Sequence, residues 1–174
     1  MEITIFKDIK DTAQPFYRDV SKILERIQEG ASQDIVRSIR EEKDKEIRNK
    51  LKQSLPAVCF SGKFSKRNDS SLLEHSGLIC LDFDNFPTEK LLLEQKEFLT
   101  KDKYTYSVFI SPSGLGLKAL VKIPAEGDTH KQFFNSLQLH YDSEYFDISC
   151  KNVSRVCYES YDPLIFINEQ SSVF

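Results

Sequence analysis

The sequence lacks the long apolar runs and the cysteine pairs that mark membrane or secreted proteins. No apolar stretch approaches the roughly 20 residues that a membrane-spanning helix needs. The N-terminus has no basic segment followed by an apolar core, so no signal peptide is apparent. The 4 cysteines form no C-x-x-C pair, and a chain of 174 residues can bury a core without disulfides. We therefore expect a reduced, cytoplasmic protein with no membrane partner.

Histidine is scarce as well, and an excess of positive charge is absent. The 3 histidines cannot be assembled into a Ser-His-Asp or zinc pattern, and no Walker-type motif occurs. The formal net charge of -3 argues against nucleic-acid binding over the whole surface, but it allows a local basic groove. Hydrophobic residues make up 40% of the chain, which is typical of a globular protein.

The first third of the chain shows mainly helical periodicity. Residues 3–6 alternate like a short strand, and a helical period begins at Phe16 and ends near Gly30. A second helix is predicted to start after Ser32 and to continue to Leu51. The charged run in its middle is interpreted as a solvated helix face.

After Pro56 the pattern changes to strands and helices in mixture. The apolar run Leu78–Leu81 is typical of a central strand covered on both faces. The alternating segments 104–110 and 117–123 predict two strands joined as a hairpin. The amphipathic segments 87–99 and 130–141 predict helices. The order predicts an α+β fold. We expect one compact domain with a helical extension over 1–55 and a core over 56–174.

Two carboxylates follow the apolar run, in the order Leu81-Asp82-Phe83-Asp84. Side chains alternate along a strand, so Asp82 and Asp84 are expected on one face with Cα atoms roughly 6.5–7 Å apart. Such a pair repels unless a cation lies between them, and Mg²⁺ or Mn²⁺ takes oxygen ligands of this kind. Two alternatives stay open. One is a strand end followed by a turn, and the other is a phosphatase of haloacid-dehalogenase type with Asp82 as nucleophile.

A glycine-rich segment joins the two strands of the predicted hairpin. Gly114 and Gly116 let the backbone approach a ligand closely, and the hydroxyls of Ser111 and Ser113 suit phosphate oxygens. Lys118 follows on the next strand, where a cation beside a glycine turn is suited to clamp a phosphate. The alternative is an ordinary hairpin with solvent-facing lysines.

A third segment places Asp147 before Arg155. Asp147 is a candidate third metal ligand and Arg155 a candidate phosphate ligand, although an Asp–Arg pair is also a common structural ion pair. The runs 61–68, 111–122 and 148–158 contain basic residues and no carboxylate, which predicts a polyanionic ligand facing them. The candidate nucleic-acid-binding residues of the first run are Lys63, Lys66 and Arg67.

In combination, these features resemble the archaeo-eukaryotic primase superfamily. The shared order is an apolar strand ending in D-x-D, an S-G-x-G hairpin, and then an Asp followed by an Arg. Four segments further resemble the VirE-type N-terminal domain, a primase-polymerase-like module of bacterial mobile elements and phages. They are Leu55–Phe64, His75–Ile79, Asp82–Asp84 and Ser154–Pro163.

The resemblance implies an RRM-like catalytic sheet and a primase-polymerase-type nucleotidyltransferase. Its implied metal site binds two Mg²⁺ or Mn²⁺ ions through Asp82, Asp84 and Asp147. The implied substrate is a nucleoside triphosphate, whose phosphates are met by Ser113, the 114–116 turn, Lys118 and Arg155. DNA template or primer and a helicase domain or protein are the implied partners.

One position departs from the family pattern. Many active primase-polymerases carry His where this chain has Lys118. Lys neutralises phosphate, but it offers no neutral imidazole near neutral pH. The alternative function is a catalytically weak module that binds nucleotide or nucleic acid and serves a helicase or replication partner.

Overall fold

In the computed structural model, which describes residues 1–174, one sheet unites the N-terminal region with later segments of the chain. Its four antiparallel strands lie in the order β2 (Phe16–Asp19), β1 (Glu2–Phe6), β3 (Ala57–Cys59) and β9 (Cys157–Tyr158). Residues 1–55 therefore contribute two strands in addition to helices. The helix predicted from Phe16 begins only at Val20, because Phe16 pairs with Ile5 across β1 and β2.

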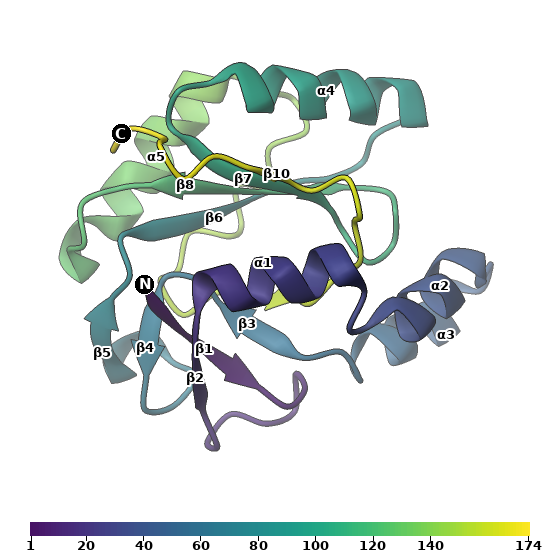
Figure 1. Ribbon diagram of the computed structural model, residues 1–174, viewed down its shortest axis with the longest axis horizontal. Helices are drawn as coiled ribbons and strands as arrows, with labels where there is room; N and C mark the ends of the chain where they lie inside the picture. The colour runs from purple at the N-terminus through teal and green to yellow at the C-terminus, as the bar shows by residue number, and fades with distance from the viewer.

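Helix α1 (Val20–Glu29) lies between the two main sheets (Figure 1). Asp19 begins it by accepting a hydrogen bond from the Ser21 backbone N–H, and Gly30 ends it in the left-handed conformation with φ of 85°. The predicted apolar stripe is confirmed, since the fully buried side chains of this helix are Val20, Ile23, Leu24 and Ile27. They pack with residues from both sheets, including Val58 and Leu120.

The single long helix predicted after Ser32 is wrong. The structure contains two short helices, α2 (Gln33–Glu41) and α3 (Lys45–Lys52). The charged run contains the break between them. Glu42 is extended, and the Asp44 side chain accepts hydrogen bonds from the backbone N–H groups of Glu46 and Ile47, which starts a new helix.

The second sheet is antiparallel and carries the predicted hairpin. Its order is β10 (Phe166–Ile167), β7 (Thr105–Ile110), β8 (Leu117–Lys122) and β6 (Leu78–Phe83). Helices α4 (Glu89–Lys101) and α5 (His130–Tyr141) cover one face of it, and α1 covers the other (Figure 1). The expectation that residues 78–81 form a central strand is wrong, because β6 lies at the edge. Its apolar run reflects burial of both faces and not the number of neighbouring strands.

A small ribbon of β4 (Gly62–Phe64) and β5 (Leu72–His75) completes the strands, with the short 3₁₀ turns η1 (Asp69–Ser71) and η2 (Gly127–Thr129) beside it. The predicted α+β class is confirmed. No helix is both long enough and apolar enough to cross a bilayer. On α4, Leu92 and Leu99 are buried, whereas Phe98 is 53% exposed.

Candidate functional site

Asp82 and Asp84 lie at the end of β6, on the face of the sheet opposite the core under α4 and α5. Between them Phe83 is fully buried in that core, so the alternation predicted for the D-x-D motif is present. The segment 145–147 runs along the free edge of β6. Asp84 N–H donates to the Tyr145 carbonyl at 2.8 Å, and Asp147 N–H donates to the Asp82 carbonyl at 2.8 Å. These two bonds place Asp147 beside Asp82.

Lys118 lies opposite Asp82 in the β6–β8 register, and the two side chains form an ion pair. Each is only 13% exposed. Burial by itself would lower the pKa of Lys118, but the charge of Asp82, assisted by the Cys157 and Cys80 thiols, raises this pKa above its ordinary value. Lys118 is therefore a fixed cation. The other oxygen of the same carboxylate, Asp82 Oδ1, is buried without a hydrogen-bond partner.

Cys150 is a site residue that sequence reasoning missed. Its thiol donates to Asp147 Oδ2 at 3.0 Å and lies 3.7 Å from Asp82 Oδ2. The possible ligand atoms of Asp82, Asp147 and Cys150 all lie within 4.8 Å of one another. Burial, followed by the hydrogen bond to Asp147, raises the pKa of this thiol to about 12. The signal in the sequence was the i, i+3 spacing from Asp147, which brings both side chains to one turn.

Asp84 and Asp147 differ in their electrostatic environment. Burial, then the neighbouring charge of Asp82, raises the pKa of Asp84. Burial also acts to raise the pKa of Asp147, but hydrogen bonds from Cys150 and Ser149 and the charge of Arg155 lower it overall. Arg155 lies 4.0 Å from Asp147 and so forms a loose ion pair with it. The structure thus brings the three predicted carboxylates to one region, although Asp84 lies outside the compact Asp82–Asp147–Cys150 cluster.

These side chains fit a divalent cation. Carboxylate oxygens are the ligands that Mg²⁺ and Mn²⁺ prefer, and the partnerless Asp82 Oδ1 is a buried polar atom that such an ion would satisfy. Asp82 and Asp147 offer candidate ligand atoms within 4.8 Å of each other, and Asp84 is a further carboxylate outside this group. A thiol in the cluster suits ions softer than Mg²⁺. The Lys118 ammonium already neutralises part of the charge of Asp82.

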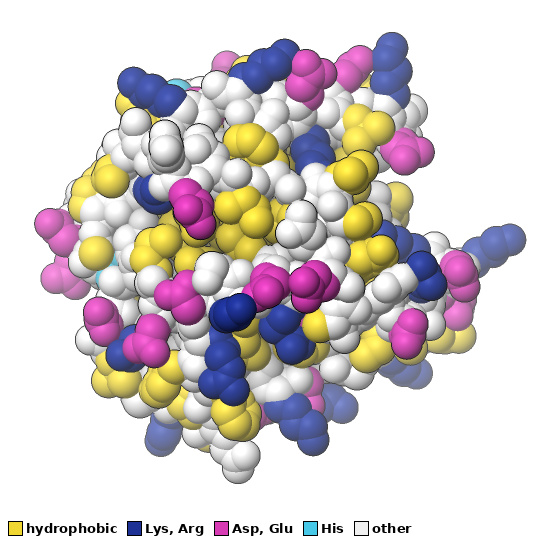
Figure 2. Space-filling model, viewed as in Figure 1, with side chains coloured by type: hydrophobic (Ala, Val, Ile, Leu, Met, Phe, Trp, Pro, Cys, Tyr) yellow, Lys and Arg dark blue, Asp and Glu magenta, His cyan; other side chains and the backbone are white.

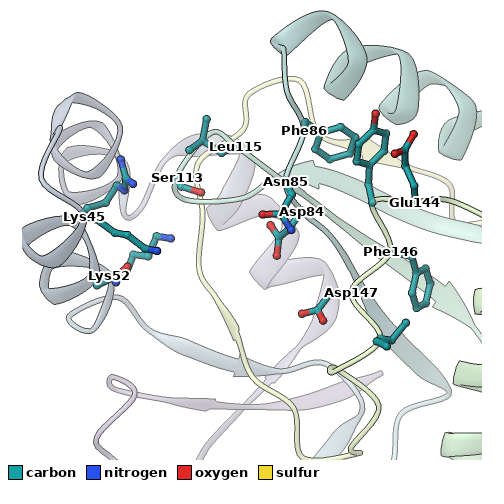
Figure 3. A pocket seen from close by; sticks show the side chains of 14 residues that line it. Lys45, Lys52, Asp84, Asn85, Phe86, Ser113, Leu115, Glu144, Phe146 and Asp147 are labelled. Atoms are coloured by element: carbon teal, nitrogen blue, oxygen red, sulfur yellow. The ribbon is translucent and has the colours of Figure 1, made fainter.

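A cavity of about 560 Å³ opens beside the carboxylates, with Asp84 and Asp147 in its wall. Figure 3 shows these two side chains facing α3, and Figure 2 shows the outline of the molecule indented between α4 and the α2–α3 pair. The wall formed by α3 carries Lys45, Arg48 and Lys52. The charged run 41–46, which includes Lys45, was assigned to a solvated face, and Arg48 and Lys52, which follow it, were not singled out from the sequence. The signal was the i, i+3, i+7 spacing of three cations.

The glycine hairpin, residues 111–116, also contributes to the cavity, through Ser113 and Leu115. Inside it, Ser111 N–H donates to the Gly116 carbonyl at 2.8 Å, and Gly114 N–H donates to the Ser111 carbonyl at 2.9 Å. The backbone N–H groups of Ser111 and Gly114 are therefore used within the turn and are not free to bind phosphate. Ser113 lines the cavity, whereas Lys118 does not. Gly116 fits closely against Asp84, since a Cβ there would collide with the carboxylate and lie 2.8 Å from the Phe83 carbonyl oxygen.

Arg40 of α2 connects the helical pair to this hairpin. Its guanidinium donates to the Tyr161 carbonyl at 2.8 Å and lies 3.4 Å from the Ser111 carbonyl. Its side-chain carbons also lie against Gly114. The position of α2 and α3 beside the site therefore depends on contacts with the hairpin and the C-terminal segment.

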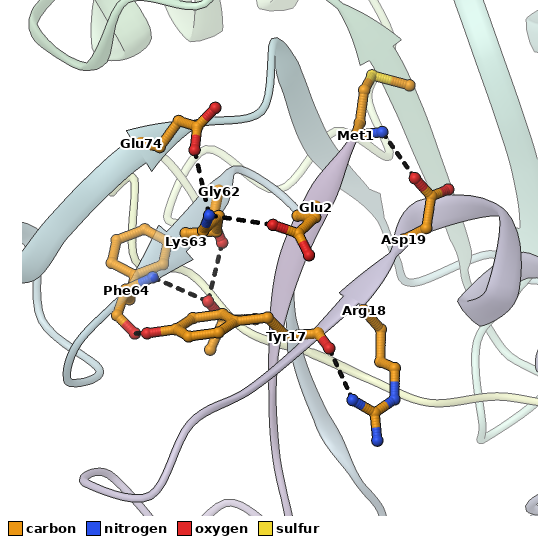
Figure 4. A network of polar contacts seen from close by, with 10 residues as sticks. Met1, Glu2, Tyr17, Arg18, Asp19, Gly62, Lys63, Phe64 and Glu74 are labelled. Carbon is orange, nitrogen blue, oxygen red and sulfur yellow. Dashed lines mark hydrogen bonds and ion pairs between the residues drawn. The ribbon is translucent and has the colours of Figure 1, made fainter.

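Lys63, Lys66 and Arg67 are not in the wall of this cavity. Lys63, on β4, lies 3.0 Å from Glu2 and 3.3 Å from Glu74, and its ammonium also lies over the Tyr17 ring (Figure 4). Lys66 is exposed, and the Nη1 atom of Arg67 is buried without a partner. Binding of nucleic acid by these three residues remains a prediction.

Comparison with known proteins identifies one family. The family described as BT4734-like, N-terminal domain, matches residues 50–166, which include the three carboxylates, the glycine hairpin and Arg155. Comparison with curated proteins and with solved structures yields no match.

Proposed function

We propose that this chain, which belongs to the BT4734-like N-terminal domain family, is a metal-dependent nucleotidyltransferase of primase-polymerase type. The observation that carries the proposal is the convergence of Asp82, Asp84 and Asp147 beside a cavity of nucleotide size. An acidic cluster with a partnerless buried oxygen suits a divalent ion, and a basic wall across the cavity suits phosphate.

The order of elements supports an RRM-like sheet. Strand β6 is followed by α4, the β7–β8 hairpin and α5, and the chain then returns along β6 through a single bridge between Phe83 and Phe146. This is the β-α-β-β-α-β succession of a split βαβ fold, with the last strand reduced to a short extended segment. Such a sheet presents Asp82, Asp84 and Asp147 on one surface.

Each site residue has a role in the proposed reaction. Asp82 and Asp147 hold Mg²⁺ or Mn²⁺, with Asp84 as the third carboxylate. A bound ion of this kind supplies activation of a 3′-hydroxyl and neutralises charge on the triphosphate. Arg155 forms only a loose ion pair with Asp147 and is 41% exposed, so its guanidinium is accessible to a phosphate that extends beyond the cavity wall, which it does not line. The substrate is a nucleoside triphosphate, and DNA template or primer is the proposed partner, with a helicase as a further one.

A second candidate function is favoured by the pairing of Lys118 with Asp82. The ammonium occupies one oxygen of the leading metal ligand, and this arrangement suits a module that binds nucleotide without efficient transfer. Binding and transfer therefore have to be measured separately.

Primer extension with labelled nucleotides in Mg²⁺ or Mn²⁺ tests the proposal. The parent is expected to incorporate nucleotide, the double variant D82N/D84N to lose incorporation, and D128N, which alters an exposed aspartate of η2 outside this cavity, to retain it. Equal incorporation by D82N/D84N would remove the carboxylates from the reaction. Nucleotide binding by a parent that incorporates nothing would establish the second candidate in place of the first.

A further inference from the structure

The wall of the cavity formed by α3 carries three cations on one helix face. Lys45, Arg48 and Lys52 are spaced so that each follows the previous one by about one turn, and all three line the cavity. Figure 3 shows Lys45 and Lys52 extending from the helix toward Asp84. Lys50 belongs to the same helix but is exposed and does not line the cavity.

These three cations have no carboxylate partner in direct contact, although Asp84 and Asp82 act on Lys52 from across the cavity. None of them takes part in an ion pair, whereas Lys22, Lys90 and Lys101 on other helices are each paired with a glutamate. Burial, and then repulsion by Arg48, lowers the pKa of Lys52. An anion in the cavity would relieve this repulsion, so the wall is suited to a ligand with several negative charges.

The opposite end of the cavity is aromatic. Phe86 and Tyr145 both line it, and their ring centroids lie 4.2 Å apart. Asp84 and Asp147 line the same cavity, and Figure 3 shows Asp84 between Phe86 and α3. The cavity thus has a cationic end, a middle that carries Asp84 and Asp147, and an end that carries the aromatic pair together with Glu144. A nucleotide has the matching sequence of polyphosphate, reacting α-phosphate and base.

We propose that Lys45, Arg48 and Lys52 bind the polyphosphate of a nucleoside triphosphate, whose base stacks on the Phe86–Tyr145 pair. This inference rests on the proposed function and assigns the orientation of its substrate. It also replaces Lys118 as the phosphate ligand, because Lys118 is paired with Asp82 and lies outside the cavity wall. The Asp84 and Asp147 carboxylates then lie beside the α-phosphate, where transfer takes place.

Calorimetric titration with two probes tests this orientation, and the probes are a nucleoside triphosphate and inorganic tripolyphosphate. The triple variant K45A/R48A/K52A is expected to bind both probes at least about a hundredfold more weakly, since each charge-assisted contact contributes about tenfold. K50A is the matched control and is expected to bind as the parent does. F86A/Y145A is expected to bind the nucleoside triphosphate more weakly and tripolyphosphate with unchanged affinity.

Several outcomes would overturn the inference. They are parent-like binding of both probes by the triple variant, equal weakening of both probes in F86A/Y145A, and no binding of either probe by the parent. Because no side chain of α3 is fully buried, the triple variant is expected to fold, and the single variant K45A repeats the test if it does not. Binding of tripolyphosphate does not depend on nucleotidyl transfer. A parent protein that shows no primer extension would therefore reject the proposed function, and the assignment of Lys45, Arg48 and Lys52 as phosphate ligands would still be tested by the binding measurements.

Discussion

Lys118 and Asp82 lie directly opposite each other in the β6–β8 pair and form an ion pair that is largely removed from solvent. Taking both charges out of water is unfavourable, and their attraction offsets that loss only while both are present. Asp82 Oδ2, the oxygen that contacts Lys118, is also the one that lies 3.7 Å from the Cys150 thiol. A divalent ion bound at this carboxylate would therefore compete with the Lys118 ammonium for its charge.

Replacing Lys118 by Ala is expected to destabilise the fold by about 3–5 kcal/mol, because it leaves a buried carboxylate without its partner. Mn²⁺ should restore part of this loss, since the ion can take the place of the ammonium. Urea unfolding of K118A with and without Mn²⁺ measures both effects, with K151A at an exposed position as control. The competition is refuted if Mn²⁺ stabilises K118A no more than the parent.

A methyl group at position 116 is expected to displace Asp84. The added Cβ of G116A collides with the Asp84 carboxylate and lies 2.8 Å from the Phe83 carbonyl oxygen, so the end of β6 must shift and metal-dependent stabilisation should fall. G114A is the matched control: it introduces strain at a φ of +73°, but its Cβ lies 3.6 Å or more from the nearest side-chain atoms, those of Arg40. Thermal melts with and without Mn²⁺ distinguish the two. An equal metal response in both variants would show that Asp84 is not a ligand.

Acid is expected to destabilise the protein through the buried pair of His75 and His130. Gly77 N–H donates to His75 Nδ1 at 3.0 Å, so a neutral His75 carries its proton on Nε2 and donates to His130 Nδ1 at 3.1 Å. Burial lowers the pKa of His75, and burial followed by the charge of His75 lowers the pKa of His130 from 6.5 to about 4. Asp69 and Lys131 are the other charges that act on His130.

The unfolded chain thus binds protons below pH 6.5 that the folded chain does not bind until about pH 4. The contribution of the neutral His130 side chain to the free energy of unfolding is complete above pH 6.5. It is lost as the pH falls from 6.5 to about 4, and the loss amounts to up to about 3 kcal/mol. H130N keeps an acceptor for His75 and should flatten the pH dependence of the free energy of unfolding between pH 7 and 4. A parent and variant with the same slope would exclude His130 as its source.

Removing Arg26 is expected to be more harmful than its exposure suggests. Its guanidinium makes two hydrogen bonds, at 2.6 and 3.0 Å, to Glu159, whose side chain is 0% exposed and also accepts from Ser32. R26A leaves the buried Glu159 carboxylate without a cation to offset its charge. The free energy of unfolding is therefore expected to fall by about 3 kcal/mol. E159Q in the R26A background should recover part of it. A double-mutant cycle with no coupling between the two positions would contradict this account.

Local patterns were sufficient to predict the elements that position the carboxylates. The apolar run before Asp82 predicted a strand because alternating faces were both buried, and the turn at 111–116 predicted the hairpin because glycine and serine break both neighbouring strands. The periodicity of α1 predicted its buried face correctly. Each of these signals depends only on residues that are close in the sequence, so it can be interpreted without knowledge of the tertiary structure.

Other features depended on contacts between distant residues. β2 is a strand only because Phe16 pairs with Ile5 of β1. The ion pair of Lys118 required the register of β8 against β6. Cys150 entered the site because Asp147 is bonded to the Asp82 carbonyl. No single segment contains these relationships.

Helix α3 is the most weakly anchored wall of the cavity, since none of its 8 residues is buried. Its amide hydrogens should exchange with solvent through local opening, whereas those of β6 and β8 are protected by pairing and by two layers of core. A ligand that bridges α3 and β6 adds its binding energy to this weak element and slows its exchange by a factor close to 1 + [L]/Kd. Hydrogen exchange over residues 45–52 therefore reports occupancy of the cavity directly, even for a ligand that the protein never converts.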